Sequence, residues 1–508
     1  MSKKTLITGT LILTLANFIT RILGFIFRVY MVDIMGAEGI GLYQLIFPIY
    51  MLTWATCSAG VSVAVSKKVA EYSTNKLYQD SIRTLKCAIA IAVTTSIPIS
   101  FLLFTFSSPI AVHIVHAPAT ALSLKLLGFC LPFMATACCI RGYFQGRQEM
   151  AIPATAQVIE QCARMIAIAV LSGYFVPYGL EFACALATVG LCVGELTSCL
   201  FTVIMYNIKK SRMTLGKATI PYPELFSSLF FLSLPITANR FLTSALQSIE
   251  HILIPLQLQK FGLDAGQAVS VFGMFTGMAM PLLQFPTMLT GSLSVALIPA
   301  ISSARAKNNT KVLQQTVSMA IQFSSLIGIG AAGLFLSLGE EIAVATYKME
   351  DVGYILKLLG VICPFFYLQS ILTGVLNGLG LQKMTFKGNL IASVACIASI
   401  LWLVPTQGLV GFTLALLLHY GIATLYHLFH ALHSIELPIN FIDWMIKPAF
   451  AISCGAVIMN YIHNNMLVNV FSLPIATLIA IAILGIFYIT FLFSFKCICK
   501  EDLQMFLR

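Results

Sequence analysis

Charged residues are scarce in this chain, at 10% of its 508 residues, whereas an ordinary soluble domain carries roughly 25%. This shortage excludes a protein whose whole surface is solvated by water. Polar linkers of the kind that separate soluble domains are missing too, because apolar runs of about 20 residues follow one another from end to end. With 58% hydrophobic residues, the chain is predicted to be a polytopic membrane protein.

Signatures of catalysis are also absent. The sequence contains no glycine-rich phosphate loop, no nucleophile elbow, no zinc-binding helix spacing and no acidic metal cluster. The 14 cysteines are mostly scattered singly through apolar runs, a pattern that argues against a disulfide framework. We therefore expect no enzyme, no cofactor and no metal site. Without a Walker motif, transport would be driven by an ion gradient, the membrane potential or the flux of substrate.

The formal net charge of +11 has a topological explanation and requires no nucleic-acid partner. Most of the 30 lysines and arginines fall in alternate loops, for example at Lys67, Arg141 and Lys209, and the loops between them hold acidic residues such as Glu38 and Glu340. Cytoplasmic loops of membrane proteins carry such an excess of basic residues. The pattern predicts a multi-pass protein of the cell membrane, with fourteen transmembrane helices and both chain ends in the cytoplasm.

A long-range repeat sets the predicted architecture. Leu-Lys-Leu-Leu-Gly occurs at residues 124–128 and again at 356–360, and Ser-Val-Ala occurs at residues 62–64 and again, at the same offset, at 294–296. Helices 1 to 6 therefore recur as helices 7 to 12, in the same orientation because six is even. We predict an all-α integral membrane fold of two six-helix lobes, with helices 13 and 14 outside the repeat. The corresponding parts are residues 1–210, 211–434 and 435–508.

Cations inside the membrane form the first candidate site, since each costs about 2.5–3.5 kcal/mol at the bilayer centre and must pair, face water or serve a ligand. Helix 1 carries Arg21 and Arg28, two turns apart on one face. Aligning the start of helix 7 with that of helix 1 places Arg240 opposite Arg21, which would give each lobe a cation. Guanidinium groups match phosphate oxygens, so the three arginines are predicted to bind a diphosphate. Snorkelling of Arg28 to the headgroups is the alternative.

Other polar residues in the membrane helices complete the candidate cavity. Gln247 and Glu250 belong to a polar stripe on helix 7, while Gln284 lies in helix 8 and Asn377 in helix 10. Such a stripe favours a cavity lining over a lipid-facing surface. We expect the uncharged side chains among them to hydrogen-bond a sugar, although joining neighbouring helices would satisfy them as well.

Helix 5 carries a candidate site for a coupling ion. Glu160 and Arg164 lie four residues apart, a spacing at which the two side chains can neutralise each other without any ligand. Glu160 is nevertheless a candidate for binding a proton or a sodium ion, because acidic groups inside membrane helices often mark ion pathways.

Several motifs resemble a known family. They are Thr-Arg-Ile-Leu-Gly-Phe at residues 20–25, Gly-Ala-Glu-Gly-Ile-Gly-Leu-Tyr at 36–43 and Ala-Val-Ser-Lys at 64–67. These segments resemble polysaccharide and lipid-linked oligosaccharide flippases, which share a superfamily with multidrug and toxin extruders. The resemblance covers essentially the whole chain and implies a two-lobed transporter that works by alternating access.

The resemblance also implies a substrate and partners. The substrate would be an undecaprenyl-diphosphate-linked glycan, such as the lipid II precursor of cortex peptidoglycan in sporulating bacteria, moved from the inner to the outer leaflet. In related lipid II flippases, helices 13 and 14 form a groove for the lipid tail, so membrane lipid is a partner, and cell-wall synthases are further candidates. Phe27 stands where those flippases carry an arginine, one residue before Arg28. The identity of the glycan therefore stays open.

Two other functions stay open beside the flippase. A multidrug extruder of the same fold would exchange a proton or a sodium ion at Glu160 for an organic cation, and a positively charged cavity disfavours such a substrate. A scaffold that recruits cell-wall synthases without transporting anything would need a docking surface, which the short loops between the helices do not offer.

Overall fold

The computed structural model describes residues 3–211, 218–435, 437, 441–495 and 497, with side chains from Ile12 onward. Within these ranges the chain consists of helices joined by short connections, and no strand is present. Contacts between residues divide the chain into two compact units, Met1–Ile252 and Leu253–Arg508. The two chain ends, which the sequence predicts to be cytoplasmic, lie outside the described residues.

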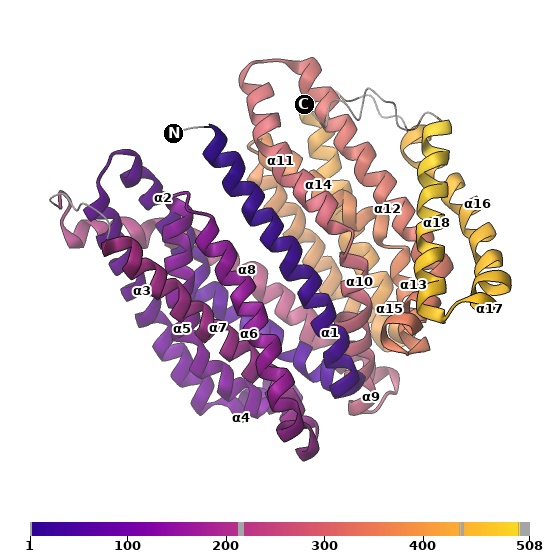
Figure 1. The fold of residues 1–508 in the computed structure, drawn as a ribbon, viewed down its shortest axis with the longest axis horizontal. Coiled ribbons are helices and arrows are strands. Elements are labelled where there is room, and N and C mark those ends of the chain that lie inside the picture. The colour runs from indigo at the N-terminus through magenta and orange to yellow at the C-terminus, as the bar shows by residue number, and fades with distance from the viewer. Residues whose placement is uncertain (1–2, 212–217, 436, 438–440, 496, 498–508) are drawn as a thin grey trace. The chain divides into compact units, whose positions relative to one another are not determined.

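The N-terminal unit is a bundle of long apolar helices in which α5 packs against both α3 and α7, and α6 packs against α7 and α1. Figure 1 shows these helices in indigo and purple. They bury small and branched side chains at their contacts, and the longest buried stretches belong to α5 and α7. Its main helices are α1 (Lys3–Trp54), α2 (Gly60–Thr74), α3 (Tyr78–Thr105), α5 (Ala121–Gly146), α6 (Ala151–Phe175), α7 (Leu180–Ser211) and α8 (Tyr222–Phe261).

Helix α8 belongs to the N-terminal unit over most of its length. Its residues up to Ile252 group with that unit, and a Cβ atom added to Gly60 would lie 2.7 Å from the carbonyl oxygen of Ser233. Further along the helix, the Ser248 hydroxyl donates a hydrogen bond to the carbonyl oxygen of Pro48 at 3.0 Å. The repeat in the sequence assigns helix 7 to the second lobe, whereas its residues up to Ile252 group with the first unit in the structure.

The C-terminal unit contains the second set of helices and the two helices that follow the repeat. Figure 1 shows α16 and α18, in yellow, beside α12, and both pack against it. Its main elements are α9 (Ala265–Phe272), η5 (Gly273–Ala279), α10 (Met280–Gln284), α11 (Thr287–Ala306), α12 (Thr310–Tyr347), α13 (Glu350–Gly360), α14 (Cys363–Gly378), α15 (Gln382–Ser434), α16 (Lys447–Ile462) and α18 (Leu473–Ser494).

The number of membrane crossings follows from where the long helices break. Twelve described segments are long and apolar enough to cross, or thirteen with the α13–α14 pair, which bends by 57°. The 52 residues of α1 would extend about 78 Å, more than twice the hydrocarbon thickness. Positive φ angles at Gly36 and Gly408 break α1 and α15 into two crossings each. The stretch from α9 to α11 is interrupted at Phe285-Pro286, and each of its two parts is long enough to cross. The total is roughly consistent with the predicted fourteen.

Equivalent hydrogen bonds confirm the internal repeat. In the N-terminal unit the Ser62 hydroxyl of α2 donates to the carbonyl oxygen of Cys138 in α5 at 3.0 Å. In the C-terminal unit the Ser294 hydroxyl of α11 donates to the carbonyl oxygen of Ser370 in α14 at 2.8 Å. Donor and acceptor are displaced along the chain by the same offset, which is that of the sequence repeat. The two helix pairs therefore pack in the same way, as the predicted parallel repeat requires.

Glycines hold the repeated helix pairs close together. A Cβ atom added to Gly142 would lie 2.6 Å from the carbonyl oxygen of Ser62, and one added to Gly374 would lie 2.6 Å from that of Ser294. No side chain fits at this separation, so both α5 and α14 approach their partner helix backbone to backbone. The predicted fold class, an all-α integral membrane protein built on a repeat, is confirmed.

Candidate functional site

A network of charged side chains joins four helices inside the N-terminal unit. Glu160 of α6 lies at its centre and accepts a hydrogen bond on each carboxylate oxygen. The Arg141 guanidinium of α5 donates to one oxygen at 3.1 Å, and the Arg164 guanidinium of α6 donates to the other at 3.1 Å. Arg141 also donates to the Ser198 hydroxyl of α7 at 3.2 Å. Each oxygen of Glu160 is therefore neutralised by its own guanidinium.

A second carboxylate, Glu195 of α7, lies on the other side of Arg141. Its side chain is only 3% exposed, and it accepts a hydrogen bond from the Tyr50 hydroxyl of α1 at 3.0 Å. Its second oxygen lies 3.9 Å from the Arg141 guanidinium, so the ion pair there is looser than the two pairs at Glu160. Arg141 is thus shared between two acidic side chains from two helices.

The close approach of α6 and α7 brings these groups together. A Cβ atom added to Gly194 would lie 2.9 Å from the carbonyl oxygen of Glu160, and one added to Gly190 would lie 3.3 Å from that of Arg164. The two glycines are four residues apart and form one face of α7, a spacing that lets membrane helices pack closely. Larger residues there would push Glu195 away from Arg141.

The network is electrically balanced when both acids and both arginines are ionised. Two positive and two negative side chains compensate each other, which limits the large cost of holding charge away from water. The arrangement can hold α1, α5, α6 and α7 in one geometry and needs no bound ion to do so. It adds no net positive charge that would attract a phosphate ligand.

The predicted cations of helix 1 lie on the side of α1 that packs against α6. Arg21 is exposed and Arg28 half-buried. Gly24 lies between them on the same face, and a Cβ atom added to it would be 3.7 Å from the Gln161 side-chain nitrogen of α6. The polar face of α1 therefore runs along the polar face of α6. Arg240 is exposed on α8, in the same compact unit as the other two arginines rather than in the second one.

The predicted polar lining is spread over both units. On α8, Gln247 is exposed and Glu250 is buried. Gln284 is the last residue of α10 and is exposed, directly before the Phe285-Pro286 interruption. Asn377 is half-buried and is the next-to-last residue of α14, where its carbonyl oxygen accepts a hydrogen bond from Gln382 at 3.4 Å. Glu160 and Arg164 are two predicted site residues whose side chains contact each other directly.

Sequence reasoning missed three members of the network. It treated Arg141 as a charge in a cytoplasmic loop, but the residue lies inside α5 and its guanidinium points at two glutamates. It passed over Glu195, although a lone acidic residue within an apolar helix is a signal by itself. Tyr50 carries no comparable signal, because tyrosine is common in membrane helices.

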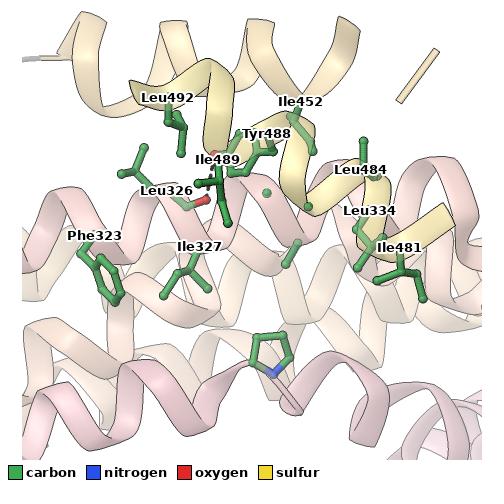
Figure 2. Close-up of a pocket in the computed structure, with 14 residues that line it drawn as sticks. Phe323, Leu326, Ile327, Leu334, Ile452, Ile481, Leu484, Tyr488, Ile489 and Leu492 are labelled. Atoms are coloured by element: carbon green, nitrogen blue, oxygen red, sulfur yellow. Dashed lines mark hydrogen bonds between the residues drawn. The ribbon is translucent and has the colours of Figure 1, made fainter. Parts of the chain in front are cut away.

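An apolar groove forms the second candidate site, within the C-terminal unit. Figure 2 shows side chains of α12, α16 and α18 around it, and Pro286 also lines the groove. Its volume is about 360 Å³. The Tyr488 hydroxyl donates to the carbonyl oxygen of Leu326 at 2.9 Å, so this polar group is satisfied within the wall. A groove of this size and character suits a hydrocarbon chain.

Two glycines shape the groove. A Cβ atom added to Gly330 of α12 would lie 2.8 Å from the Tyr488 ring, so that glycine lets α18 approach. Gly485 of α18 also lines the groove, and a Cβ atom there would meet nothing within 4 Å. Gly485 therefore faces open space.

Comparison with known sequences relates the chain to one group of membrane proteins. The family model described as Polysaccharide biosynthesis protein matches residues 6–305. Stage V sporulation protein B of Bacillus subtilis (strain 168) is 29% identical over 514 residues, covering 99% of this chain and 98% of that protein. Lipid II flippase MurJ of the same organism is 27% identical over 460 residues, covering 84% of this chain and 82% of that protein.

Comparison with solved structures supports the fold. Lipid II flippase MurJ in an inward closed conformation matches with a TM-score of 0.70 at 18% identity, covering 95% of this chain and 98% of that one. An inward-facing multidrug resistance MATE family transporter matches with a TM-score of 0.63 at 16% identity, covering 82% and 94%. The resemblance predicted from the opening motifs is confirmed.

Proposed function

Because the chain belongs to the polysaccharide biosynthesis protein family, we propose that it is a flippase for a lipid-linked glycan. It moves this lipid from the inner to the outer leaflet by alternating access, without enzymatic chemistry. The observation that carries the proposal is the apolar groove of about 360 Å³ that α16 and α18, the two helices outside the repeat, form with α12.

The substrate we propose is an undecaprenyl-diphosphate-linked glycan, and a peptidoglycan precursor of the lipid II type is the first candidate. Two relatives support this choice by name, one as a lipid II flippase and one as a sporulation protein. The diphosphate binds to Arg21, Arg28 and Arg240, because the planar guanidinium donates two parallel hydrogen bonds to phosphate oxygens. Arg21 and Arg240 are exposed and Arg28 is half-buried, so a ligand can reach all three.

The sugar meets uncharged and acidic groups, and the tail meets the groove. We assign sugar contacts to Gln247, Glu250, Gln284 and Asn377, whose amide and carboxylate groups match hydroxyl donors and acceptors. The tail gains about 25 cal/mol for each Å² of apolar surface removed from water, but little when it leaves lipid for protein. The groove therefore guides the tail during transport rather than supplying most of the affinity.

We also propose that transport is coupled to sodium or to a proton at Glu160 and Arg164. The existing hydrogen bonds of Glu160 determine what ion binding requires. Both oxygens of Glu160 already accept a hydrogen bond from a guanidinium. A cation or proton at Glu160 would compete with the charges of Arg141 and Arg164 for the carboxylate. Ion binding is therefore expected to weaken the pairing of Glu160 with Arg141, which joins α6 to α5.

The test is leaflet exchange of labelled undecaprenyl-diphosphate disaccharide-pentapeptide in vesicles that contain the purified protein, with and without an imposed membrane potential. We expect exchange well above that of protein-free vesicles. Exchange of a different lipid-linked glycan, with none of this one, would keep the class and change the substrate. Failure with every lipid-linked glycan would contradict the proposal.

Filling the groove is expected to slow transport. Gly485→Leu adds a side chain into open space, so the helix keeps its packing while the groove loses the volume of a leucine side chain. We expect flipping of the long-tailed substrate to fall by about fivefold or more, with unchanged thermal stability, as measured in the vesicle assay. Gly173→Leu is the matched control, because that glycine of α6 also faces open space and lies in the other unit. Equal rates for both variants would remove the groove from the mechanism.

A multidrug extruder is the second candidate, and the structural match to a MATE family transporter favours it. Three arginines in the proposed cavity repel organic cations, which argues against the usual cationic drugs. Resistance profiles of a deletion strain distinguish the two functions, since loss of an extruder sensitises cells to drugs and loss of a glycan flippase does not do so selectively.

A further inference from the structure

The connection between α7 and α8 is held against the first turn of α3 by a buried aspartate. Asp80 has no exposed surface. Its carboxylate accepts hydrogen bonds from the backbone N–H of Thr219, at 3.2 Å to each oxygen, and from the backbone N–H of Ile220 at 3.4 Å. The Thr219 hydroxyl donates to the same carboxylate. Three donors of the connection thus converge on one side chain of another helix.

An arginine one turn further along α3 also binds this segment. Arg83 donates to the carbonyl oxygen of Ile220 at 2.7 Å, and its guanidinium carbon lies 3.9 Å from the centre of the Tyr222 ring. Its guanidinium is also 3.9 Å from the Asp80 carboxylate. Asp80 accepts hydrogen bonds from the backbone N–H groups, and Arg83 donates to the carbonyl oxygen and lies over the tyrosine ring. Backbone donors and a backbone acceptor of the segment are therefore both paired.

Apolar side chains at the start of α8 also pack against the N-terminal unit. Leu225 and Leu229 are almost completely buried, and they belong to the same hydrophobic core as residues of α2, α3 and α5. The first two turns of α8 are therefore seated on the N-terminal unit directly after the polar contacts end.

The internal repeat shows that the fold of α3 does not require these two charges. Its counterpart in the C-terminal unit is α12, whose first residue, Thr310, is the repeat equivalent of Tyr78, the first residue of α3. At the same offset, Asp80 and Arg83 correspond to Val312 and Gln315. Helix α12 forms and packs without an acid or a base at these positions. The charged pair is therefore explained by the segment it binds rather than by its own helix.

We propose that Asp80 and Arg83 form a clasp that fixes Thr219 and Ile220, the residues that lead into α8, and makes the start of α8 a rigid part of the N-terminal unit. The inference rests on the proposed function, because a fixed start of α8 matters only if the lobes move. Helix α8 continues past Ile252 into the residues that group with the C-terminal unit. With its first turn fixed, α8 moves together with the N-terminal unit during transport. Without the clasp, the first turn shifts independently of that unit, and less of the movement reaches the residues past Ile252.

Hydrogen exchange tests the clasp itself. In Asp80→Asn the backbone N–H groups of Thr219 and Ile220 lose their charged acceptor, and we expect their exchange to become at least tenfold faster in the full-length protein. Glu71→Gln is the matched control, because this carboxylate of α2 is 52% exposed and pairs with Lys68 at the surface. Thr219→Val, which removes the hydroxyl donor and keeps the backbone N–H, gives the same direction of change if Asp80→Asn does not fold.

Flipping rates test the role of the clasp in transport. We expect Asp80→Asn and Thr219→Val to lower the maximal rate about fivefold without changing the substrate concentration at half-maximal rate, since no binding group is altered. Unchanged exchange at Thr219 and Ile220 would overturn the clasp. Faster exchange with a wild-type flipping rate would overturn its role in transport. A wild-type protein that flips no lipid-linked glycan would instead contradict the proposed function, and the exchange result would still stand.

Discussion

Replacing Arg141 by alanine is expected to destabilise the protein by about 3–5 kcal/mol, the range measured when one partner of a buried ion pair is removed. Arg141 is the shared cation of the network, bonded to Glu160 at 3.1 Å and lying 3.9 Å from Glu195. Without it, Glu160 still has Arg164, but Glu195 keeps only the Tyr50 hydroxyl. An uncompensated carboxylate with 3% exposure would then remain inside a membrane helix.

A second substitution separates lost packing from unpaired charge. Glu195→Gln in the Arg141→Met background removes the stranded charge and keeps the approximate volumes, so we expect most of the lost stability to return. Replacing both members of a buried pair by neutral groups is often nearly neutral in energy, whereas removing one member is not. Thermal unfolding in detergent is measured for the wild type, Arg141→Ala, Arg141→Met and the double variant Arg141→Met/Glu195→Gln.

The control for this experiment is a pair at the surface. Lys68 and Glu71 lie 3.2 Å apart, with a partly exposed lysine and an exposed glutamate, and exposed pairs contribute about 0–1 kcal/mol. Lys68→Ala should therefore leave the unfolding temperature almost unchanged. If Arg141→Ala behaves like Lys68→Ala, the network does not hold the four helices together.

Loss of a membrane arginine is expected to abolish most of the flipping activity. Truncating one partner of a desolvated, hydrogen-bonded charge pair costs about 2–5 kcal/mol, and each 1.4 kcal/mol is a factor of ten. We therefore expect Arg21→Ala and Arg240→Ala each to reduce flipping by about 30-fold or more. The vesicle assay measures the rates, with the amount of inserted protein matched between variants.

Two further variants show whether the effect comes from the geometry of the guanidinium or from charge in general. Arg21→Lys keeps the charge and loses the two-pronged geometry, so an intermediate rate is expected if a diphosphate is the ligand. Lys125→Ala is the control, because Lys125 is a cation at the start of α5 that lies 4.7 Å from the centre of the Phe104 ring. Wild-type flipping by Arg21→Ala would show that the helix 1 cation does not bind the substrate.

Much of the fold was predictable because its signals are local or repetitive. Apolar runs long enough to cross a bilayer identify the helices, since every backbone group of a lipid-exposed segment must be hydrogen-bonded within it. The recurrence of short motifs at one constant offset predicted the repeated packing that Ser62 and Ser294 now display. The exact breaks were less accessible. Gly36 and Gly408 adopt positive φ angles inside otherwise continuous helices, and many other glycines of the chain do not.

The candidate site was predictable only where its partners are close in sequence. Glu160 and Arg164 form an ion pair over one helical turn, as their spacing suggested. Glu195 and Tyr50 are 145 residues apart in the sequence, and no local sequence pattern predicts a contact over that separation. Arg141 was assigned to a cytoplasmic loop because the excess of basic residues on that side predicts arginines near helix ends. This pattern does not distinguish an arginine that faces water from one that faces two glutamates.

The sequence by itself determined that the chain crosses the membrane many times, that its two sets of helices repeat, and that few charges lie within them, because hydropathy and periodicity act residue by residue. Only the tertiary structure decided which of those charges meet, where α12, α16 and α18 leave a groove, and that Asp80 and Arg83 bind the residues that lead into α8. These features depend on how side chains of distant segments pack in three dimensions, and packing is not encoded in any single stretch of the chain.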